Sequence, residues 1–271
     1  DSAPATTLNW VGFDVSAASF VDNFSILAQD NSPSGLAFNA DGTKMFVLGY
    51  QNDSVNEYAL STGFDVSTAS FTDAFSVASQ DTIPYGLAFS PDGTKMFVVG
   101  YSGQDVNEYT LSTGFDVSTA SFVDSFSVSS QDTQPSGVAF NTDGTKMFVT
   151  GITGQDINEY TLSTGFDVST ASFVDSFSVS AQDTSPSSLT FNADGTKMFV
   201  CGQTGDDINE YALSTGFDVS TASYTQVFSV APNVDRPVGI AFNASGLKMF
   251  VLGQSSGYQK VNEYSISGTL A

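Results

Sequence analysis

The side chains that most often carry out chemistry in proteins are scarce in this chain of 271 residues. It contains no histidine, one cysteine (Cys201) and one arginine (Arg236). Because histidine is absent, Ser-His-Asp triads and histidine-ligated metal centres are excluded. The remaining candidates for acid–base chemistry or metal binding are the 29 aspartates and glutamates.

Most of these carboxylates follow a repeat, and 22 of the 29 occupy five positions that return about every 51 residues. The motif DGTKMF, which begins at Asp41, returns at Asp92, Asp143 and Asp194, and in altered form at Ser245. Each repeat also carries one glutamate and one lysine. These are Glu57, Glu108, Glu159, Glu210 and Glu263, with Lys44, Lys95, Lys146, Lys197 and Lys248. One copy per repeat favours a structural role, so we expect each glutamate to be partly buried and paired with a lysine.

A single repeat predicts four β-strands. In the second repeat, apolar or alternating runs cover 84–89, 95–100, 106–111 and 122–128, and residues 90–93 have the composition of a tight turn. Four such strands cannot bury both of their faces alone, so the sheets must stack on one another. Radial stacking predicts an all-β, five-bladed β-propeller with four antiparallel strands per blade.

The two ends of the chain are consistent with a closed ring. The sequence starts with a fourth-strand pattern at 20–26 and finishes with a third-strand pattern at 261–266. We therefore expect the N-terminal strand to complete the last blade. Residues 1–271 are expected to form one domain, with the segment 1–11 preceding the first repeat.

A family resemblance supports this fold. The segment from Pro135 to Val149, PSGVAFNTDGTKMFV, resembles the signature of YVTN- and NHL-type propeller repeats, and all five units carry a version of it. The repeat here is longer, and the blades fewer, than is usual in those families. The resemblance implies the propeller fold and little about activity, because the families span unrelated functions.

Differences between repeats indicate which surface is free to bind. The units that start at Gly114 and Gly165 share 41 of 51 residues. Most differences lie in or near two loops, one joining strands two and three, the other joining strand four to the next blade. Both loops leave an antiparallel blade on the same side, so one face is predicted to vary, as binding faces do. Neutral drift in surface loops is the alternative.

The candidate ligand-binding residues are the tyrosines, aspartates and the arginine of those loops. They are Tyr50, Asp53, Tyr85, Tyr101, Asp105, Asp156, Asp206, Asp207, Arg236 and Tyr258. Tyrosine beside polar side chains suits a carbohydrate or protein ligand. No cofactor is expected, although Asp105, Asp156, Asp206 and Asp207 leave calcium open as a weaker possibility.

The formal charge of −22 limits the classes of molecule that the chain can bind. Nucleic acid is disfavoured because phosphate contacts need clustered lysine and arginine, and an anionic membrane surface would repel the chain. No apolar run is long enough for a membrane span. Such acidity fits an extracellular or cell-surface protein.

Catalysis is not expected from the innermost strands, whose central residues are small. These residues are Ala37, Ala88, Ala139, Thr190 and Ala241, which offer no acid–base pair. The sequence therefore predicts a non-enzymatic extracellular binding or adhesion module that uses the variable loops. A self-associating subunit of a filament or surface layer is the alternative, and a consensus-designed propeller is a third interpretation.

Overall fold

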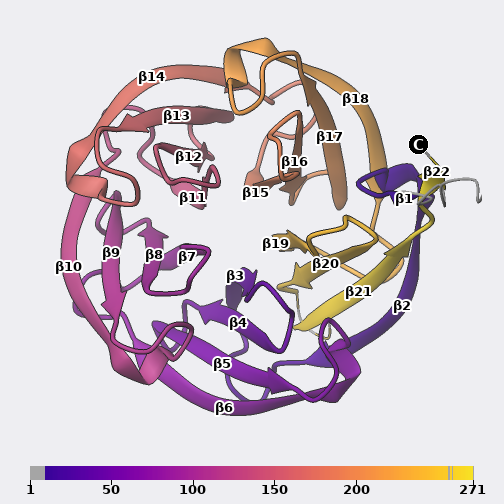
Figure 1. Ribbon diagram of the computed structural model, residues 1–271, viewed down its shortest axis with the longest axis horizontal. Helices are drawn as coiled ribbons and strands as arrows, with labels where there is room; N and C mark the ends of the chain where they lie inside the picture. The colour runs from indigo at the N-terminus through magenta and orange to yellow at the C-terminus, as the bar shows by residue number, and fades with distance from the viewer. Residues whose placement is uncertain (1–9, 256, 258, 271) are drawn as a thin grey trace, which may run out of the picture.

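Five four-stranded antiparallel sheets surround a central axis in the computed structural model, which describes residues 10–255, 257 and 259–270 (Figure 1). The innermost strands are β3 (Pro33–Phe38), β7 (Pro84–Phe89), β11 (Pro135–Phe140), β15 (Pro186–Phe191) and β19 (Pro237–Phe242). The second strands are β4 (Lys44–Gly49), β8 (Lys95–Gly100), β12 (Lys146–Gly151), β16 (Lys197–Gly202) and β20 (Lys248–Gly253). The third strands are β5 (Ser54–Leu60), β9 (Asp105–Leu111), β13 (Asp156–Leu162), β17 (Asp207–Leu213) and β21 (Lys260–Ile266).

The outermost strands are preceded by short 3-10 helices. These strands are β6 (Ala69–Ser76), β10 (Ala120–Ser127), β14 (Ala171–Ser178), β18 (Ala222–Ser229) and β2 (Ala18–Ser25). The helices are η2 (Val66–Thr68), η3 (Val117–Thr119), η4 (Val168–Thr170), η5 (Val219–Thr221) and η1 (Val15–Ala17). Asp116 caps η3, because its side chain accepts a hydrogen bond from the Ser118 N–H. No helix in the described part of the chain is long and apolar enough to cross a membrane.

The ring closes as the repeat pattern predicts. The N-terminal strand β2 pairs with β21, with Phe20 opposite Tyr264 and Asp22 opposite Glu263, so it forms the outer edge of the fifth blade. A second, smaller contact joins the ends, where β1 (Trp10–Val11) pairs with β22 (Thr269–Leu270). The prediction of a five-bladed propeller closed by its N-terminal strand is confirmed.

The hydrophobic core lies between the blades. Phe97 of β8 is fully buried, and its ring centroid lies 4.3 Å from that of Phe140 in the next blade and 6.1 Å from that of Phe166. Val99 and Met147 are buried in the same cluster. Because five such clusters fill the spaces between neighbouring sheets, each blade buries its apolar faces only in the presence of the others.

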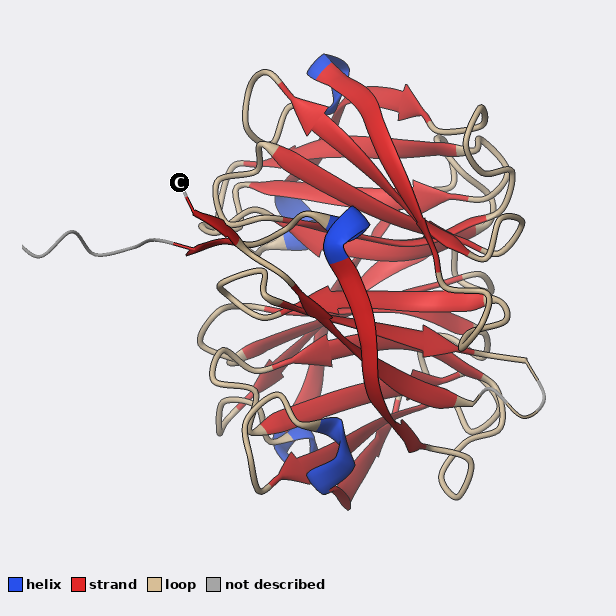
Figure 2. Ribbon diagram, turned by 90° about the vertical axis from the view of Figure 1, so that its right-hand side faces the viewer, coloured by secondary structure: helices blue, strands red, loops and turns tan. Residues whose placement is uncertain are grey.

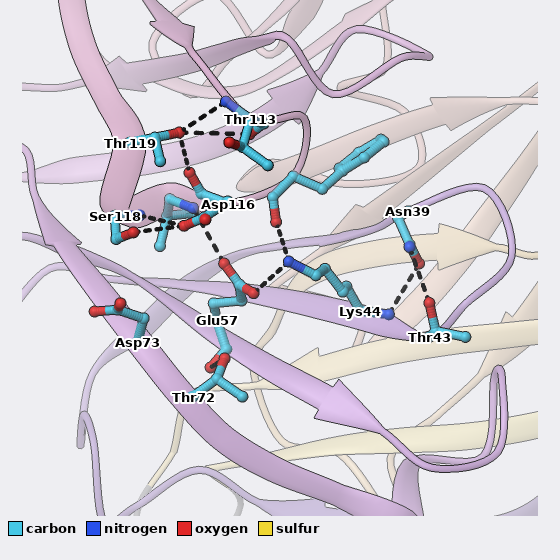
Figure 3. Close-up of polar contacts among 12 residues, drawn as sticks. Asn39, Thr43, Lys44, Glu57, Thr72, Asp73, Thr113, Asp116, Ser118 and Thr119 are labelled. Atoms are coloured by element: carbon cyan, nitrogen blue, oxygen red, sulfur yellow. Dashed lines mark hydrogen bonds and ion pairs between the residues drawn. The ribbon is translucent and has the colours of Figure 1, made fainter.

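A lysine–glutamate pair ties each blade to the next. Lys44 Nζ lies 2.6 Å from Glu57 Oε1 and donates a second hydrogen bond to the Phe115 carbonyl of the following blade (Figure 3). The other oxygen of Glu57 accepts from the Val117 N–H at 3.1 Å. The same contacts recur around the ring, with N···O distances of 2.6–2.8 Å in the five pairs. The prediction that each glutamate is partly buried and ion-paired is confirmed.

The propeller has two different faces. The turns between the first and second strands and the 3-10 helices lie on one face, called here the constant face, from which β1 and β22 project (Figure 2). The opposite, variable face consists of two sets of loops. The first set covers 50–53, 101–104, 152–155, 203–206 and 254–259, and the second covers 26–32, 77–83, 128–134, 179–185 and 230–236. The Tyr101 N–H donates to the Ile83 carbonyl at 3.0 Å, so the two loops of one blade lie side by side.

Candidate functional site

Buried aspartates join the two loops of the variable face in the first four blades. Asp132 is 2% exposed, and its carboxylate accepts hydrogen bonds from the Gln134 N–H at 2.5 Å and the Gly154 N–H at 2.6 Å. It also lies against Gly151, where a Cβ atom would come within 2.4 Å of Asp132 Oδ2. The equivalent residues are Asp30, Asp81 and Asp183. These carboxylates position the loops, and the sequence reading had assigned them no role.

The fifth blade departs from this arrangement. Val234, which is fully buried, stands where the other blades have the aspartate. The neighbouring Asp235 instead accepts a hydrogen bond from Ser255 Oγ at 2.5 Å. Ser255 belongs to the only variable-face loop that is longer than its counterparts. A part-buried serine–aspartate contact, with the backbone bond from the Gln254 N–H to the Arg236 carbonyl, therefore joins the two loops of the fifth blade.

Arg236 follows directly and is held in an unusual conformation. Its φ of 56° lies in the left-handed region, which non-glycine residues seldom occupy. Two sets of contacts hold it there: its N–H donates to Asp206 Oδ1 at 2.8 Å, and its Nε and Nη2 donate to Gln203 Oε1 at 3.2 and 2.8 Å. The remaining guanidinium N–H groups stay free to bind a carboxylate or phosphate within the described residues.

A pocket of about 520 Å³ opens beside this arginine on the variable face. We call it the arginine pocket. It is lined by Leu27, Asn31, Ser32, Tyr50, Tyr85, Arg236, Gln254, Ser255 and Gln259. The rings of Tyr50 and Tyr85 are 6.4 Å apart at an angle of 35°. Two aromatic surfaces, several amide and hydroxyl groups and one cation therefore share a concave site, as is typical of ligand pockets.

The surroundings of Tyr85 determine the protonation of its hydroxyl. Burial is the main cause that raises the pKa of its hydroxyl, followed by the neighbouring Tyr50. The positive charge of Arg236 acts in the opposite direction on the same pKa. The hydroxyl therefore stays protonated near neutral pH and can both donate and accept hydrogen bonds.

Three of the ten residues predicted from the sequence line the arginine pocket, namely Tyr50, Tyr85 and Arg236. Tyr101 is 37% exposed on the variable face but does not line the arginine pocket. Asp206 accepts a hydrogen bond from the backbone N–H of Arg236. Tyr258 lies outside the described residues.

The other predicted aspartates do not line the pocket, and they belong to different blades. The carboxylates of Asp105, Asp156 and Asp207 each accept a hydrogen bond from an asparagine amide of their own strand. Burial is the main cause that raises their pKa, in Asp207 to about 6. Asp53 has an enclosed Oδ1 without a partner within the described residues.

This arrangement does not support the calcium interpretation. No group of three or more carboxylate or thiol side chains that could hold a metal ion occurs among the described residues. Cys201 is fully buried, and burial raises the pKa of its thiol to about 12. The thiol is thus an apolar filler of β16 rather than a ligand or nucleophile.

Sequence reasoning missed most of the polar lining. Asn31, Ser32, Gln254, Ser255 and Gln259 complete the pocket, and all of them fall in the loops that vary between repeats. The signal that could have found them is position in the loop. Ser32 and Arg236 are equivalent residues in different blades, as are Tyr50 and Gln254, so the same two loop positions of two blades line the pocket.

No family model matches this sequence, and no curated protein matches it. Solved propellers do resemble it. A functionally unknown protein from Desulfotomaculum acetoxidans superimposes with a TM-score of 0.54 at 16% identity, covering 88% of this chain and 70% of that one. A putative 6-phosphogluconolactonase from Bacteroides uniformis gives 0.51 at 15% identity, with the same coverage. Another from Bacteroides fragilis gives 0.50 at 16%, covering 88% and 69%. At this identity the likeness shows the propeller fold.

These comparisons correct the functional prediction. Two propellers that resemble this chain are named after a hydrolase, so the prediction of a non-enzymatic extracellular binding or adhesion module, or of a filament subunit, is contradicted. The reasoning had equated missing histidine and a small-residue axis with missing catalysis. The polar and charged residues of the loop face were assigned to ligand binding alone and not considered for catalysis. The resemblance to YVTN and NHL repeats has no family match to support it beyond the shared fold.

Proposed function

We propose that the chain is a hydrolase of the sugar-lactone class that binds an anionic sugar ring in the arginine pocket. The observation that carries this proposal is the pocket itself, in which the only arginine of a chain with charge −22 lies beside two tyrosine rings. The names of the two Bacteroides structures suggest the reaction class.

The tyrosines suit the ring of a sugar derivative. Tyr50 is 38% exposed, so part of its side chain is open to a ligand, and the Tyr85 ring lies 6.4 Å from the Tyr50 ring in the same pocket. An aromatic surface packs against the C–H groups of a sugar, and its phenol binds hydroxyl groups. Gln254 and Asn31 add amide donors and acceptors for the remaining hydroxyls.

The arginine suits a phosphate or carboxylate on that sugar. Gln203 fixes one side of the guanidinium, which lowers the entropy cost of binding an anion with the other side. The net charge of −22 disfavours anions over most of the surface. An anionic ligand in this pocket should therefore bind through Arg236, its only cationic lining residue.

The serine–aspartate contact supplies a base. Lactone hydrolysis adds water to the ring carbonyl carbon, breaks the ring C–O bond and gives the ring oxygen a proton. A water molecule at Ser255 Oγ can pass a proton to the serine while the serine proton moves to Asp235, 2.5 Å away. Asp235 then gives its proton back to Ser255, which passes a proton to the departing ring oxygen.

The test is hydrolysis of 6-phosphoglucono-δ-lactone and of glucono-δ-lactone, followed by acid release. We expect Arg236→Gln to raise KM for the phosphorylated lactone by roughly tenfold or more, in line with a lost charged contact of about 1.5–3 kcal/mol, and to change the neutral lactone little. Asp235→Asn should lower kcat instead. Lys260→Gln, a cation outside the pocket, is the matched control. Wild-type rates equal to spontaneous hydrolysis for both lactones would refute the proposal.

We also propose a distant relation to YVTN- and NHL-type repeats. The support is that the signature residues have structural roles here. Pro135 begins β11, and Gly144 has a φ of 71° beneath the Phe166 ring, where a Cβ would lie 2.3 Å from the ring atoms. Sequences intermediate between the two repeat types should keep both residues. Intermediates that replace them while keeping the fold would argue against the relation.

A further inference from the structure

A second cavity, of about 380 Å³, lies along the central axis and opens toward the constant face. We call it the axial cavity. It shares no residue with the arginine pocket. Its wall is formed by residues of the innermost strands, including Ala37, Phe38, Phe140, Thr190 and Phe242, and none of its lining residues carries a charge. A hollow of about 350 Å³ at the mouth adds the rings of Phe89 and Phe191.

One side of this wall differs from the rest. Four blades place glycine and alanine two residues apart at the axis, as Gly137 and Ala139 do in β11. The fourth blade has Ser188 and Thr190 at these positions, although it is nearly identical in sequence to the third. Both residues line the axial cavity, and neither hydroxyl makes a hydrogen bond within the described part of the chain.

Two free hydroxyl groups stand on a wall whose other side chains are apolar or aromatic, apart from Asn39, whose amide already bonds to Thr43 and to the Lys44 N–H. These hydroxyls define the chemistry of a ligand. The phenylalanine rings favour a flat apolar body, and the uncharged wall disfavours an ion. The hydroxyls favour one polar group on the side of the fourth blade. We propose that the axial cavity binds a small neutral aromatic molecule with a single hydroxyl group, such as a phenol, which hydrogen-bonds to Ser188 or Thr190.

The chain supplies its own control variants, because the other blades show which residues the fold accepts. Thr190→Ala and Ser188→Gly install the residues of the equivalent strands, so both variants should fold. Calorimetric titration with p-cresol should show one saturable site. We expect at least one of the two variants to weaken p-cresol binding by about 3- to 10-fold, as for one lost neutral hydrogen bond.

Two comparisons distinguish binding in the axial cavity from nonspecific hydrophobic binding and from binding in the arginine pocket. Toluene, which lacks the hydroxyl, should bind with an affinity that Thr190→Ala leaves unchanged. Arg236→Gln should leave p-cresol binding unchanged. The proposal is overturned if p-cresol shows no saturable binding to the intact chain, if both hydroxyl variants bind it as the wild type does, or if Arg236→Gln abolishes its binding.

Discussion

At the scale of single residues, the lysine–glutamate pairs explain why every repeat keeps a glutamate at a buried position. Glu108 is 3% exposed and uses both carboxylate oxygens, one for Lys95 and one for the Val168 N–H of the next blade. A buried charge is tolerated only with such partners. The pair therefore contributes to the junction between blades as well as to its own sheet.

Glu108→Gln should lower the free energy of unfolding by roughly 2 kcal/mol, because the hydrogen bonds to Lys95 and Val168 lose their charged acceptor. Urea unfolding measures the difference. Asp124→Asn removes the same charge from the exposed cross-strand neighbour in β10 and should change stability by less than about 0.5 kcal/mol. Equal stabilities of wild type and Glu108→Gln would show that the ion pair contributes nothing to the junction.

At the scale of the elements, the variable face is divided into four similar loop pairs and one that differs. The buried aspartate in each of the first four blades fixes the distance between two loops, and Val234 removes this device from the fifth. In the fifth blade the loop 254–259 is longer than its counterparts, and the loop 230–236, which lacks the aspartate, carries the arginine. The pocket is thus a consequence of broken symmetry in one repeat.

Asp132→Ala should separate the loop pair of the third blade. It leaves the N–H groups of Gln134 and Gly154 without their acceptor, at a cost of about 1–3 kcal/mol. We expect faster hydrogen exchange at these two amides, with little change in the fifth blade. If both amides keep wild-type protection, the carboxylate does not hold the loops.

At the scale of the whole molecule, the partly buried aspartates make stability depend on pH. Asp207 has a pKa of about 6, because of burial and then the charge of Asp183. A carboxyl whose folded pKa exceeds its unfolded value of about 3.8 binds protons more tightly in the native state. The contribution of Asp207 to stability should therefore be lost as the pH rises from about 4 through 6, and the self-repulsion of the acidic chain acts in the same direction.

Asp207→Asn should reduce the stability difference between pH 4.5 and pH 7.5, by an amount on the order of 1 kcal/mol after allowance for solvent screening of a half-buried group. Thermal unfolding at the two pH values measures it, and Asp124→Asn again provides the control. The expectation fails if the variant keeps the full wild-type difference.

The whole architecture could be predicted from the sequence because each repeat shows the same four strand patterns. The fourth-strand pattern near the start of the chain also completes the three strands of the last repeat. The lysine–glutamate pairs followed from their one-per-blade count. The site could be predicted only in part. Which loop residues share the pocket depends on the left-handed backbone at Arg236, which has no local sequence signal. It also depends on Val234, whose replacement of an aspartate is visible between repeats although the loss of a loop-joining carboxylate is not.

The shifts in strand pairing within the blades could not be predicted from the sequence either. The alternation of Phe122 and Asp124 predicted a regular outer strand, whereas the pairing of β10 with β9 shifts between these two residues. Phe122 is 44% exposed on this outer strand, and its ring lies edge-on to that of Tyr109. The extracellular location and any protein partner or self-association stay predictions.

The most direct test of the account is a crystal structure of the chain with 6-phosphogluconate, the open-chain acid that lactone hydrolysis would release. The account predicts the ligand in the arginine pocket, with its phosphate or carboxylate within hydrogen-bonding distance of Arg236 and its carbon chain against Tyr50 or Tyr85. An arginine pocket that holds only solvent at saturating ligand, or a ligand bound only at another part of the surface, would contradict it.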